Sequence, residues 1–379
     1  MRIALSAGEA SGDRLGAGLA RALSAACPGI ELSGMGGDEM AEAGVRLVQH
    51  AREVAVVGIV EVARHLPTIR NAMARMRALL EDERPDLFVP IDYPDFNLRL
   101  AAQACAAGVP VVYYVSPQVW AWRRGRVRTI RDLVRRVLVL FPFETAFYER
   151  ERVPATFVGH PAAAARARAD RAEVRRAAGL DPARPLVALL PGSRRGEVGR
   201  LLPILGRAGR VLAASHSQAQ FVIPKARTLP PGLVETIAAR EAPSGTVVLG
   251  DLYPEILEAA DCGAVASGTA TLDAALAGMP LVAVYRMQPL SYLVARALVD
   301  VAHVALPNLV AGRRIVPELV QGDCTPEGIA RELAAYLADG GVAAAVRAAL
   351  GAVREGLHGD GAYERAAAAV LAEVGRIPD

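Results

Sequence analysis

The chain has 379 residues, which is more than one hydrophobic core usually supports, so two domains of about 150–200 residues each are expected. Apolar residues make up 53% of the sequence, yet no uncharged apolar run reaches the roughly 18 residues of a transmembrane helix. The formal net charge is only +3, and no helix-turn-helix, zinc-finger or RNA-recognition pattern is present, which argues against a nucleic-acid-binding protein.

The N-terminal residues lead directly into a strand-like run, without the basic region, apolar core and cleavage site of a signal peptide, which predicts a cytoplasmic protein. The four cysteines lie far apart and form no C-x-x-C pair. Neither a disulfide framework nor a zinc site is therefore predicted.

Short β-branched runs alternate with longer helical patterns from the first residue onward, which is typical of β-α-β units with a parallel sheet. The expected strands are Ile3–Ser6, Leu87–Ile91, Val111–Val115, Val137–Leu140 and Thr156–Val158 in the first half, and Leu186–Leu190, Phe221–Ile223, Val247–Leu249, Cys262–Ala266 and Leu281–Val284 in the second. The predicted fold class is α/β with two similar lobes.

The predicted domains are an N-terminal lobe at 1–165, a second lobe at 166–350 and a helical tail at 351–379. The boundary falls in a stretch of Ala, Arg, Asp and Pro that suits an exposed connection, part of which can be helical. The Ala-rich C-terminal part is expected to form at least three helical segments, and such a tail can pack back onto the first lobe.

After the first expected strand comes SAGEASGDRLGAG at 6–18, with four glycines around the start of a helix. Glycines let the backbone approach a ligand, and the free N–H groups of a helix N-terminus favour an anion. The spacing differs from G-x-G-x-x-G, which disfavours a nicotinamide dinucleotide. Ser11 and Gly12 are therefore candidate donor-binding residues, with a tight strand-to-helix turn as the alternative.

The run LFVPIDYPDFN at 87–97 places two aspartates just beyond the carboxyl end of a buried strand, where open α/β sheets bind ligands. Asp95 fits the cap of a helix expected at Phe96–Ala107. Asp92 is then the freer carboxylate and the candidate general base. The pair is D-x-x-D rather than the D-x-D associated with metal-held sugar nucleotides, so no metal is predicted.

Both tryptophans, Trp120 and Trp122, directly precede an arginine-rich helical pattern that begins with Arg123 and Arg124. Aromatic residues beside arginines suit an anionic lipid surface or a phosphorylated substrate. The alternative is a solvated basic helix with aromatic residues in the core.

A second strand, glycine turn and helix occurs in LLPGSRRGEV at 189–198. Gly192 and Ser193 can present backbone and hydroxyl donors, and Arg194 can neutralise the charge that grows on a leaving diphosphate. Two leucines of the following helix are candidates for partial contact with acyl chains or bilayer, although packing on the sheet is the favoured alternative: Leu201 and Leu202.

A third junction of this kind is ASGTATLDAALAGMP at 266–280. Ser267, Gly268 and Thr269 at a helix N-terminus suit phosphate oxygens, and Asp273 one turn later suits ribose hydroxyls. Capping by Ser267 or Thr269 is the alternative at this junction, but capping alone does not account for three glycine-marked junctions. Farther along, Asn308 stands in an expected loop between apolar runs, where its amide can bind a sugar, phosphate or base.

These motifs, taken in order, resemble the lipid-A-disaccharide synthase family, an inverting glycosyltransferase family of bacterial lipid A assembly. The resemblance extends from residue 3 to about 335. It is carried by the runs AGEASGD, VVGIVEV, IDYPDFN, YYVSPQVWAWR, FPFE, GHP, LLPGSR, ASGTATLD, YRMQPLSYLVA and LPNLVAGR.

The resemblance implies a GT-B fold, meaning two Rossmann-like lobes with the active site between them, and no metal or other cofactor. It implies transfer of 2,3-diacylglucosamine from its UDP derivative to 2,3-diacylglucosamine 1-phosphate, giving a β-1′,6-linked disaccharide and UDP. Because both substrates carry acyl chains, it also implies a peripheral protein on the anionic inner face of the inner membrane of a Gram-negative bacterium.

Carried onto this sequence, the family's proposed base falls on Asp92, and residues important for activity or donor binding fall on Ser11, Arg194 and Asn308. Asp273 departs from the family pattern, because it stands where the SGTAxLE segment of the family has glutamate. Its carboxylate is one methylene shorter, which leaves its ribose-binding role open.

Three rival interpretations remain at this point. Two are enzymes: another GT-B transferase, such as the one that makes the peptidoglycan lipid intermediate, and a UDP-sugar epimerase. The third is a sugar-nucleotide-binding regulator that has lost catalysis, against which the retention of Asp92 and Arg194 argues.

Overall fold

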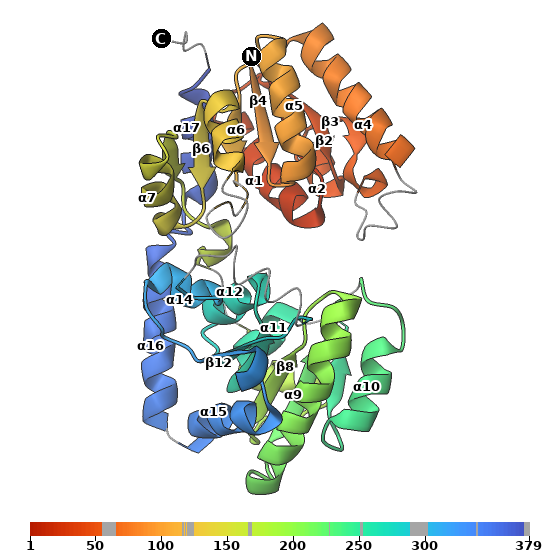
Figure 1. Ribbon diagram of the computed structural model, residues 1–379, viewed down its shortest axis with the longest axis vertical. Helices are drawn as coiled ribbons and strands as arrows, with labels where there is room; N and C mark the ends of the chain where they lie inside the picture. The colour runs from red at the N-terminus through yellow and green to blue at the C-terminus, as the bar shows by residue number, and fades with distance from the viewer. Residues whose placement is uncertain are drawn as a thin grey trace. The chain divides into compact units, whose positions relative to one another are not determined.

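The computed structural model describes residues 1–54, 66–115, 117, 119, 125–165, 169–226, 228–250, 253–288, 302–338 and 340–374 (Figure 1). They form two compact units, one of Met1–Ala164 together with the residues from Leu357 onward, and one of Ala165–Gly356. Each unit contains a parallel β-sheet with helices between its strands. The prediction of an α/β fold with two Rossmann-like lobes is therefore confirmed.

The first unit has a seven-stranded sheet in the order β3-β2-β1-β4-β5-β6-β7. Its strands are β1 (Arg2–Ala7), β2 (Glu31–Gly36), β3 (Arg46–His50), β4 (Leu87–Ile91), β5 (Val112–Tyr114), β6 (Arg136–Val139) and β7 (Ala155–Phe157). Two of these strands, β2 and β3, were not predicted. The reason is visible in β2, which reads ELSGMG and lacks the β-branched run that marks a buried strand.

The helices of the first unit are α1 (Ala10–Ala26), α2 (Asp38–Glu42), α4 (Leu66–Ala78), α5 (Pro94–Ala106), α6 (Arg126–Leu133), α7 (Pro142–Arg150) and α17 (Ala362–Leu371). Short 3₁₀ turns lie at Ala51–Glu53 and Pro161–Ala163, and α4 continues into a π-helical turn at Leu79–Glu83. The apolar spacing of Met73, Met76, Leu79 and Leu80 predicts a helix at Val62–Glu83, which α4 and this turn match from Leu66 onward; residues 62–65 lie outside the described residues.

The C-terminal segment belongs to the first unit because α17 packs on α1. Gly18 of α1 faces the ring of Tyr363, and a Cβ at Gly18 would collide with that ring. Arg365 donates hydrogen bonds to the carbonyl oxygens of Val158, at 2.9 Å, and His358. The chain therefore returns to complete the first unit after forming the second.

Replacing Gly18 with alanine should lower the free energy of unfolding by about 1–3 kcal/mol, because the added methyl overpacks the contact between α1 and α17. Thermal unfolding followed by circular dichroism measures the change. Gly351→Ala is the matched control, since Gly351 is also helical and has no atom within 4 Å of an added Cβ. A Gly18→Ala midpoint equal to that of the control would contradict the docking of α17 on α1.

The second unit has a six-stranded sheet in the order β10-β9-β8-β11-β12-β13. Its strands are β8 (Leu186–Leu190), β9 (Gln220–Pro224), β10 (Val247–Leu249), β11 (Cys262–Ala266), β12 (Leu281–Tyr285) and β13 (Glu318–Val320). Its helices are α8 (Arg171–Ala177), α9 (Arg195–Ser215), α10 (Leu233–Glu241), α11 (Tyr253–Ala259), α12 (Thr269–Leu276), α14 (Leu306–Ala311), α15 (Pro326–Ala338) and α16 (Gly340–Gly356). A 3₁₀ turn lies at Gln321–Asp323.

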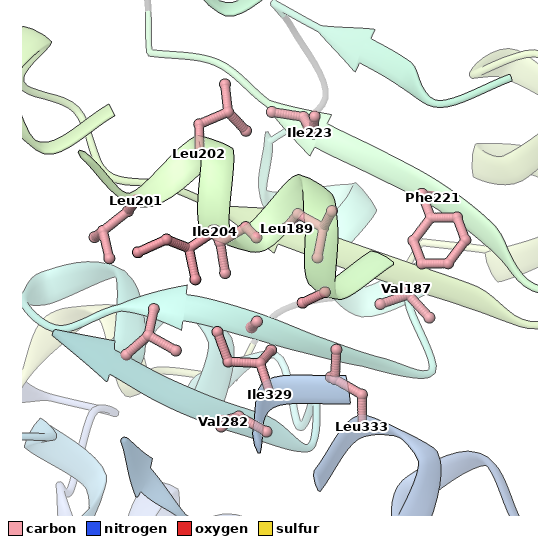
Figure 2. Close-up of a cluster of buried hydrophobic side chains, with 14 of the residues drawn as sticks. Val187, Leu189, Leu201, Leu202, Ile204, Phe221, Ile223, Val282, Ile329 and Leu333 are labelled. Atoms are coloured by element: carbon pink, nitrogen blue, oxygen red, sulfur yellow. The ribbon is translucent and has the colours of Figure 1, made fainter. Parts of the chain in front are cut away.

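Helices cover both faces of this second sheet, and alternate residues of each strand point to opposite faces. Val187 and Leu189 of β8 pack with α9, α10 and α15 on one face, and α9 lies between α15 and α10 in Figure 1. Leu186 and Leu190 pack with α8, α11 and α12 on the other face. Figure 2 shows the first of these clusters, to which α15 contributes Ile329 and Leu333.

Candidate active site

The first candidate region lies where β1 and β4 end side by side. Ala7 pairs with Ile91, and the chain runs from β1 outward to β3 before it returns to β4, so the sheet order reverses at this point. Ligands of open α/β sheets bind at such a switch point, beyond the carboxyl ends of the strands. Gly12 is buried, and a Cβ at this position would lie only 3.3 Å from the Cβ of Ala7. Ser11 is exposed in the first turn of α1.

Asp92 directly follows β4 in a left-handed conformation, with φ of 47°. Burial raises the pKa of its carboxyl group to about 6, and the negative charge of Glu9 acts in the same direction. A hydrogen bond from the backbone N–H of Tyr93 opposes this shift. The result is a half-buried carboxylate at the switch point that is mostly ionised at neutral pH and basic enough to accept a proton.

Asp95 does not cap a helix, contrary to the sequence prediction. Helix α5 begins at Pro94 with Tyr93 in the cap position, so Asp95 lies inside the first turn. The proline fits there because the first helical position needs no N–H donor. The exposed carboxylate of Asp95 pairs with Nη2 of Arg126 from α6. Of the two aspartates after β4, only Asp92 is half-buried.

The second unit has a comparable switch point between β8 and β11, because the chain runs from β8 to β10 and then returns to β11. After β8, Gly192 adopts φ of 101°, and a Cβ there would lie 2.7 Å from Oε2 of Glu197. Ser193 is exposed, and the side chain of Arg194 is 73% exposed while Nη1 lies 3.6 Å from Oε1 of Glu197. Arg194 is therefore available to an anionic ligand at the start of α9.

After β11, the adjacent junction begins α12 with Gly268 at φ of 146° and with Thr269 exposed in the first helical position. The hydroxyl of Ser267 does not cap the helix, because it donates a hydrogen bond of 2.6 Å to the carbonyl of Val304. Asp273 accepts a hydrogen bond of 3.3 Å from the hydroxyl of Tyr253. The two glycine-marked junctions of this unit thus lie on neighbouring strands of one sheet edge.

Asn308 is fully buried in helix α14 (Leu306–Ala311), whereas the sequence analysis expected it in a loop with its amide available to the donor. Its Nδ2 donates to the carbonyl of Val316 and to Oε1 of Glu318, and its Oδ1 accepts from the backbone N–H groups of Ile315 and Val316. Both donors and both acceptor positions of the amide are therefore used. Asn308 holds the loop around β13 instead of presenting its side chain to a ligand.

Replacing Asn308 with alanine should lower the free energy of unfolding by about 1–3 kcal/mol or more, because the buried carbonyl and N–H of Val316 lose their hydrogen bonds. Chemical denaturation measures this loss, and UDP titration calorimetry on the folded protein measures binding. Thr236→Val, at an exposed position of α10, is the control and should leave stability nearly unchanged. Wild-type stability together with weakened UDP binding in Asn308→Ala would contradict this buried structural role.

The prediction that Leu201 and Leu202 contact lipid is wrong. Their exposed fractions are 2% and 0%, and both belong to the core cluster of α9 and the sheet, as Figure 2 shows. The helical spacing of these leucines matches the buried stripe of α9. The other four predicted lipid contacts lie outside the described residues: Trp120, Trp122, Arg123 and Arg124.

Two residues that contact Asp92 were missed by the sequence analysis. Tyr113 of β5 and Asn97 of α5 both donate hydrogen bonds of 2.7 Å to the main-chain carbonyl of Asp92. Their motifs had been singled out, but a contact across neighbouring strands leaves no signal in residue spacing. Among the residues that the structure describes, no group of three or more His, Cys, Asp or Glu side chains is arranged to hold a metal ion.

The family model described as lipid-A-disaccharide synthetase matches residues 3–372 of the chain. The chain belongs to this lipid-A-disaccharide synthase family. A lipid-A-disaccharide synthase of Geobacter sulfurreducens is 44% identical over 376 residues, covering 99% of this chain and 98% of the relative. One of Myxococcus xanthus is 45% identical over 373 residues, covering 98% and 97%. Membership of this synthase family makes the chain a glycosyltransferase of lipid A biosynthesis and confirms the resemblance seen in the sequence.

Solved structures support the GT-B fold expected of this synthase family. The glycosyltransferase of kitacinnamycin has a TM-score of 0.66 at 18% identity and covers 98% of this chain and 99% of its own. A putative UDP-N-acetylglucosamine 2-epimerase from Listeria monocytogenes has a TM-score of 0.64 at 12% identity, with 92% and 91% covered. Because transferases and epimerases share this fold, the sequence family and not the fold separates them.

Proposed function

We propose that this protein transfers 2,3-diacylglucosamine from UDP-2,3-diacylglucosamine to 2,3-diacylglucosamine 1-phosphate, with inversion, and releases UDP. The observation that carries the proposal is the half-buried carboxylate of Asp92 with a pKa of about 6 at the switch point of the first unit. It is supported by the anion-accepting junctions at the switch point of the second unit and by membership of the synthase family.

In the proposed reaction, Asp92 removes the proton from the 6-hydroxyl of the acceptor while the hydroxyl oxygen attacks the anomeric carbon of the donor. The bond between that carbon and the diphosphate breaks on the opposite face, so the configuration inverts. A base whose pKa is near neutral combines an ionised fraction with useful basicity, which is what general base catalysis requires.

The leaving UDP carries increasing negative charge as the glycosidic bond breaks. Arg194 can pair with the diphosphate, and the backbone N–H groups at the starts of α9 and α12 favour its charge. We assign Gly192, Ser193, Ser267, Gly268 and Thr269 to this surface, and Ser11 and Gly12 to the donor at the first switch point. Asp273, held by Tyr253, is assigned to the ribose hydroxyls.

Mass-spectrometric product analysis tests this function directly. The purified protein is mixed with UDP-2,3-diacylglucosamine, 2,3-diacylglucosamine 1-phosphate and a chelator. A tetraacyl disaccharide phosphate together with UDP is the expected result and also establishes turnover without a divalent metal. Isomerised UDP-sugar would support an epimerase, and UDP binding without turnover, even after metal is added back, would support a regulator.

We also propose that the protein associates peripherally with the anionic inner face of the inner membrane, where its acylated substrates reside. No single helix in the described ranges is both long enough and apolar enough to cross a membrane. Helix α6 buries Val127 and Ile130 and leaves Arg128 and Arg131 exposed, together with Asp132, which lies 3.9 Å from Arg131. The exposed side of the helix is therefore basic on balance. Basic residues near an anionic membrane surface contribute about 1 kcal/mol each.

Sedimentation with vesicles that contain phosphatidylglycerol should therefore pellet the protein at low salt and release it as salt screens the charges. The variant Arg128→Glu/Arg131→Glu should bind about tenfold or more weakly. Arg240→Glu/Arg331→Glu is the control, because these exposed arginines lie on α10 and α15 of the second unit. Equal binding of all three proteins to anionic and neutral vesicles would contradict the proposal.

A further inference from the structure

The carboxyl ends of two neighbouring strands carry residues in an unusual backbone conformation. Asp92 and Tyr93, which follow β4, have φ of 47° and 50°, and Val115, which follows β5, has φ of 58°. Non-glycine residues rarely adopt this left-handed region, and a β-branched valine does so least of all. Each such residue costs about 1–3 kcal/mol, and strain of this kind persists only where surrounding contacts hold it. The contacts around Asp92 therefore identify what maintains its conformation.

The main-chain carbonyl of Asp92 is held from two sides. The hydroxyl of Tyr113 donates to it from the neighbouring strand β5 at 2.7 Å, and Nδ2 of Asn97 donates to it from the first turns of α5 at 2.7 Å. Tyr113 and Asn97 are both fully buried. Burial raises the pKa of the Tyr113 hydroxyl well above its usual value, so this group stays protonated and remains a donor.

The amide of Asn97 is itself oriented by β1. The hydroxyl of Ser6 donates to Oδ1 of Asn97 at 2.7 Å, which turns Nδ2 toward the carbonyls of Ser6, Ile91 and Asp92. The bond to Asp92 is the shortest of the three. Residues from β1, α5 and β5 thus converge on one carbonyl oxygen.

Tyr93 is fixed at its other end. Its hydroxyl donates to the carbonyl of Val54 at 3.1 Å, and its ring lies against Gly8, where a Cβ would collide with the ring. The peptide between Asp92 and Tyr93 therefore has its carbonyl held on one side and the following side chain held on the other. This arrangement directs the N–H of Tyr93 toward the carboxylate of Asp92, and the hydrogen bond between them lowers the pKa of that carboxyl group.

We infer that Tyr113 and Asn97 are positioning residues. Their hydrogen bonds to the main-chain carbonyl of Asp92 hold its carboxylate in the orientation that a general base requires. The inference rests on the proposed role of Asp92. Neither residue touches the reacting atoms, because both donate to the carbonyl on the main chain. Ser6 contributes indirectly, because its hydroxyl orients the amide of Asn97.

The hydrogen bonds that hold the backbone at Asp92 also affect the pKa of its carboxyl group. The N–H of Tyr93 lowers the pKa of Asp92, so loss of this hydrogen bond raises the pKa. A base must be ionised to act, and a higher pKa moves the acidic limb of the kcat profile to higher pH. The charged neighbours do not change when Tyr113 is replaced: Glu9 faces Asp92 from the turn after β1, Arg126 of α6 faces Tyr113, and Asp95 faces Tyr93.

The test compares two adjacent tyrosines of β5. Tyr113→Phe removes the donor and keeps the ring. Tyr114→Phe is the matched control, because Tyr114 is equally buried and its hydroxyl has no hydrogen-bond partner among the described residues. Steady-state kinetics of UDP release across pH should give at least about a tenfold lower kcat for Tyr113→Phe, with KM for both substrates nearly unchanged and the acidic limb at higher pH. Tyr114→Phe should match the wild-type protein in all three quantities.

Ser6→Ala provides a milder second variant, since it removes only the hydrogen bond that orients Asn97, and it should move kcat and the acidic limb in the same direction by less. If Tyr113→Phe and Ser6→Ala match Tyr114→Phe in kcat and in the position of the limb, or lose activity equally at every pH, the positioning role is overturned. Measuring Asp92→Asn in parallel separates the two proposals. If Asp92→Asn is inactive and Tyr113→Phe has wild-type kinetics, only the positioning role of Tyr113 and Asn97 is overturned. If Asp92→Asn is active, the role of Asp92 as the base is overturned.

Discussion

Replacing Asp92 with asparagine should lower kcat by about 10²–10⁴-fold, because the amide cannot accept the acceptor's proton. UDP binding should remain close to that of the wild-type protein. In the wild-type protein, kcat should fall as pH drops through about 6, where burial places the pKa of Asp92, and this acidic limb should vanish in the residual activity of the variant. Initial rates of UDP release between pH 5 and 9, with titration calorimetry for UDP, measure these quantities.

The same variant should be more stable than the wild-type protein at pH 7. The pKa of Asp92 is raised on folding, so the folded state binds the proton more tightly than the unfolded chain and loses stability as pH rises from about 4 to 6. Asparagine carries no charge and avoids this loss. A higher thermal midpoint at pH 7, together with little difference at pH 4, would show that the lost turnover does not come from unfolding.

Asp95→Asn is the control for Asp92→Asn. Asp95 is exposed and pairs with Arg126, so its replacement should change kcat by no more than a few fold. If Asp95→Asn loses turnover and Asp92→Asn keeps it, Asp95 is the base and the assignment made here is wrong.

Replacing Arg194 with alanine should lower kcat by about 10²–10³-fold, the range seen when a group that stabilises developing negative charge is removed. The side chain is 73% exposed and its contact with Glu197 is long, at 3.6 Å, so stability should change little. Arg194→Lys should recover part of the activity, because lysine keeps the charge but lacks the fork that pairs with two phosphate oxygens. Single-turnover rates at saturating donor measure the effect on the transfer step.

Arg195→Ala is the matched control for Arg194. Arg195 is also exposed and is the first residue of α9, yet it lies one position farther from the glycine turn. Its replacement should leave kcat within a few fold of wild type. Equal losses in both variants would indicate a general attraction of the donor by the basic helix start and would remove the specific role of Arg194.

The strands that could be predicted from the sequence are those with continuous apolar runs. The predicted limits of β4, β8, β10 and β11 match the structure because each strand is a continuous apolar run bounded by proline, glycine or polar residues. Strand β2 has glycines and a serine at buried positions, and β13 reads ELV, with a glutamate as its first residue. β2 pairs with β1 and β3, and β13 pairs with β12, and such pairing with distant segments leaves no local pattern in the sequence.

The candidate site could be predicted in part for the same reason. Asp92 was found because a carboxylate that follows a buried strand lies at the ligand-binding edge of a sheet. The hydrogen bonds from Tyr113 and Asn97 to its main-chain carbonyl were not predicted. They depend on the pairing of β4 with β5 and on the position of α5, which the sequence does not show directly. Asn308 was expected in a loop between apolar runs, whereas it lies in α14 and its amide makes four hydrogen bonds within the protein.

The docking of α17 on α1 also bears on the order in which the protein matures on the ribosome. All strands of the first sheet have been synthesised by Phe157, but the helix that covers Gly18 of α1 is not complete until Leu371. The second unit has all its elements by Gly356. The half of the chain that is made first is therefore finished last, and until then nascent chains expose the surface of α1 that α17 will cover.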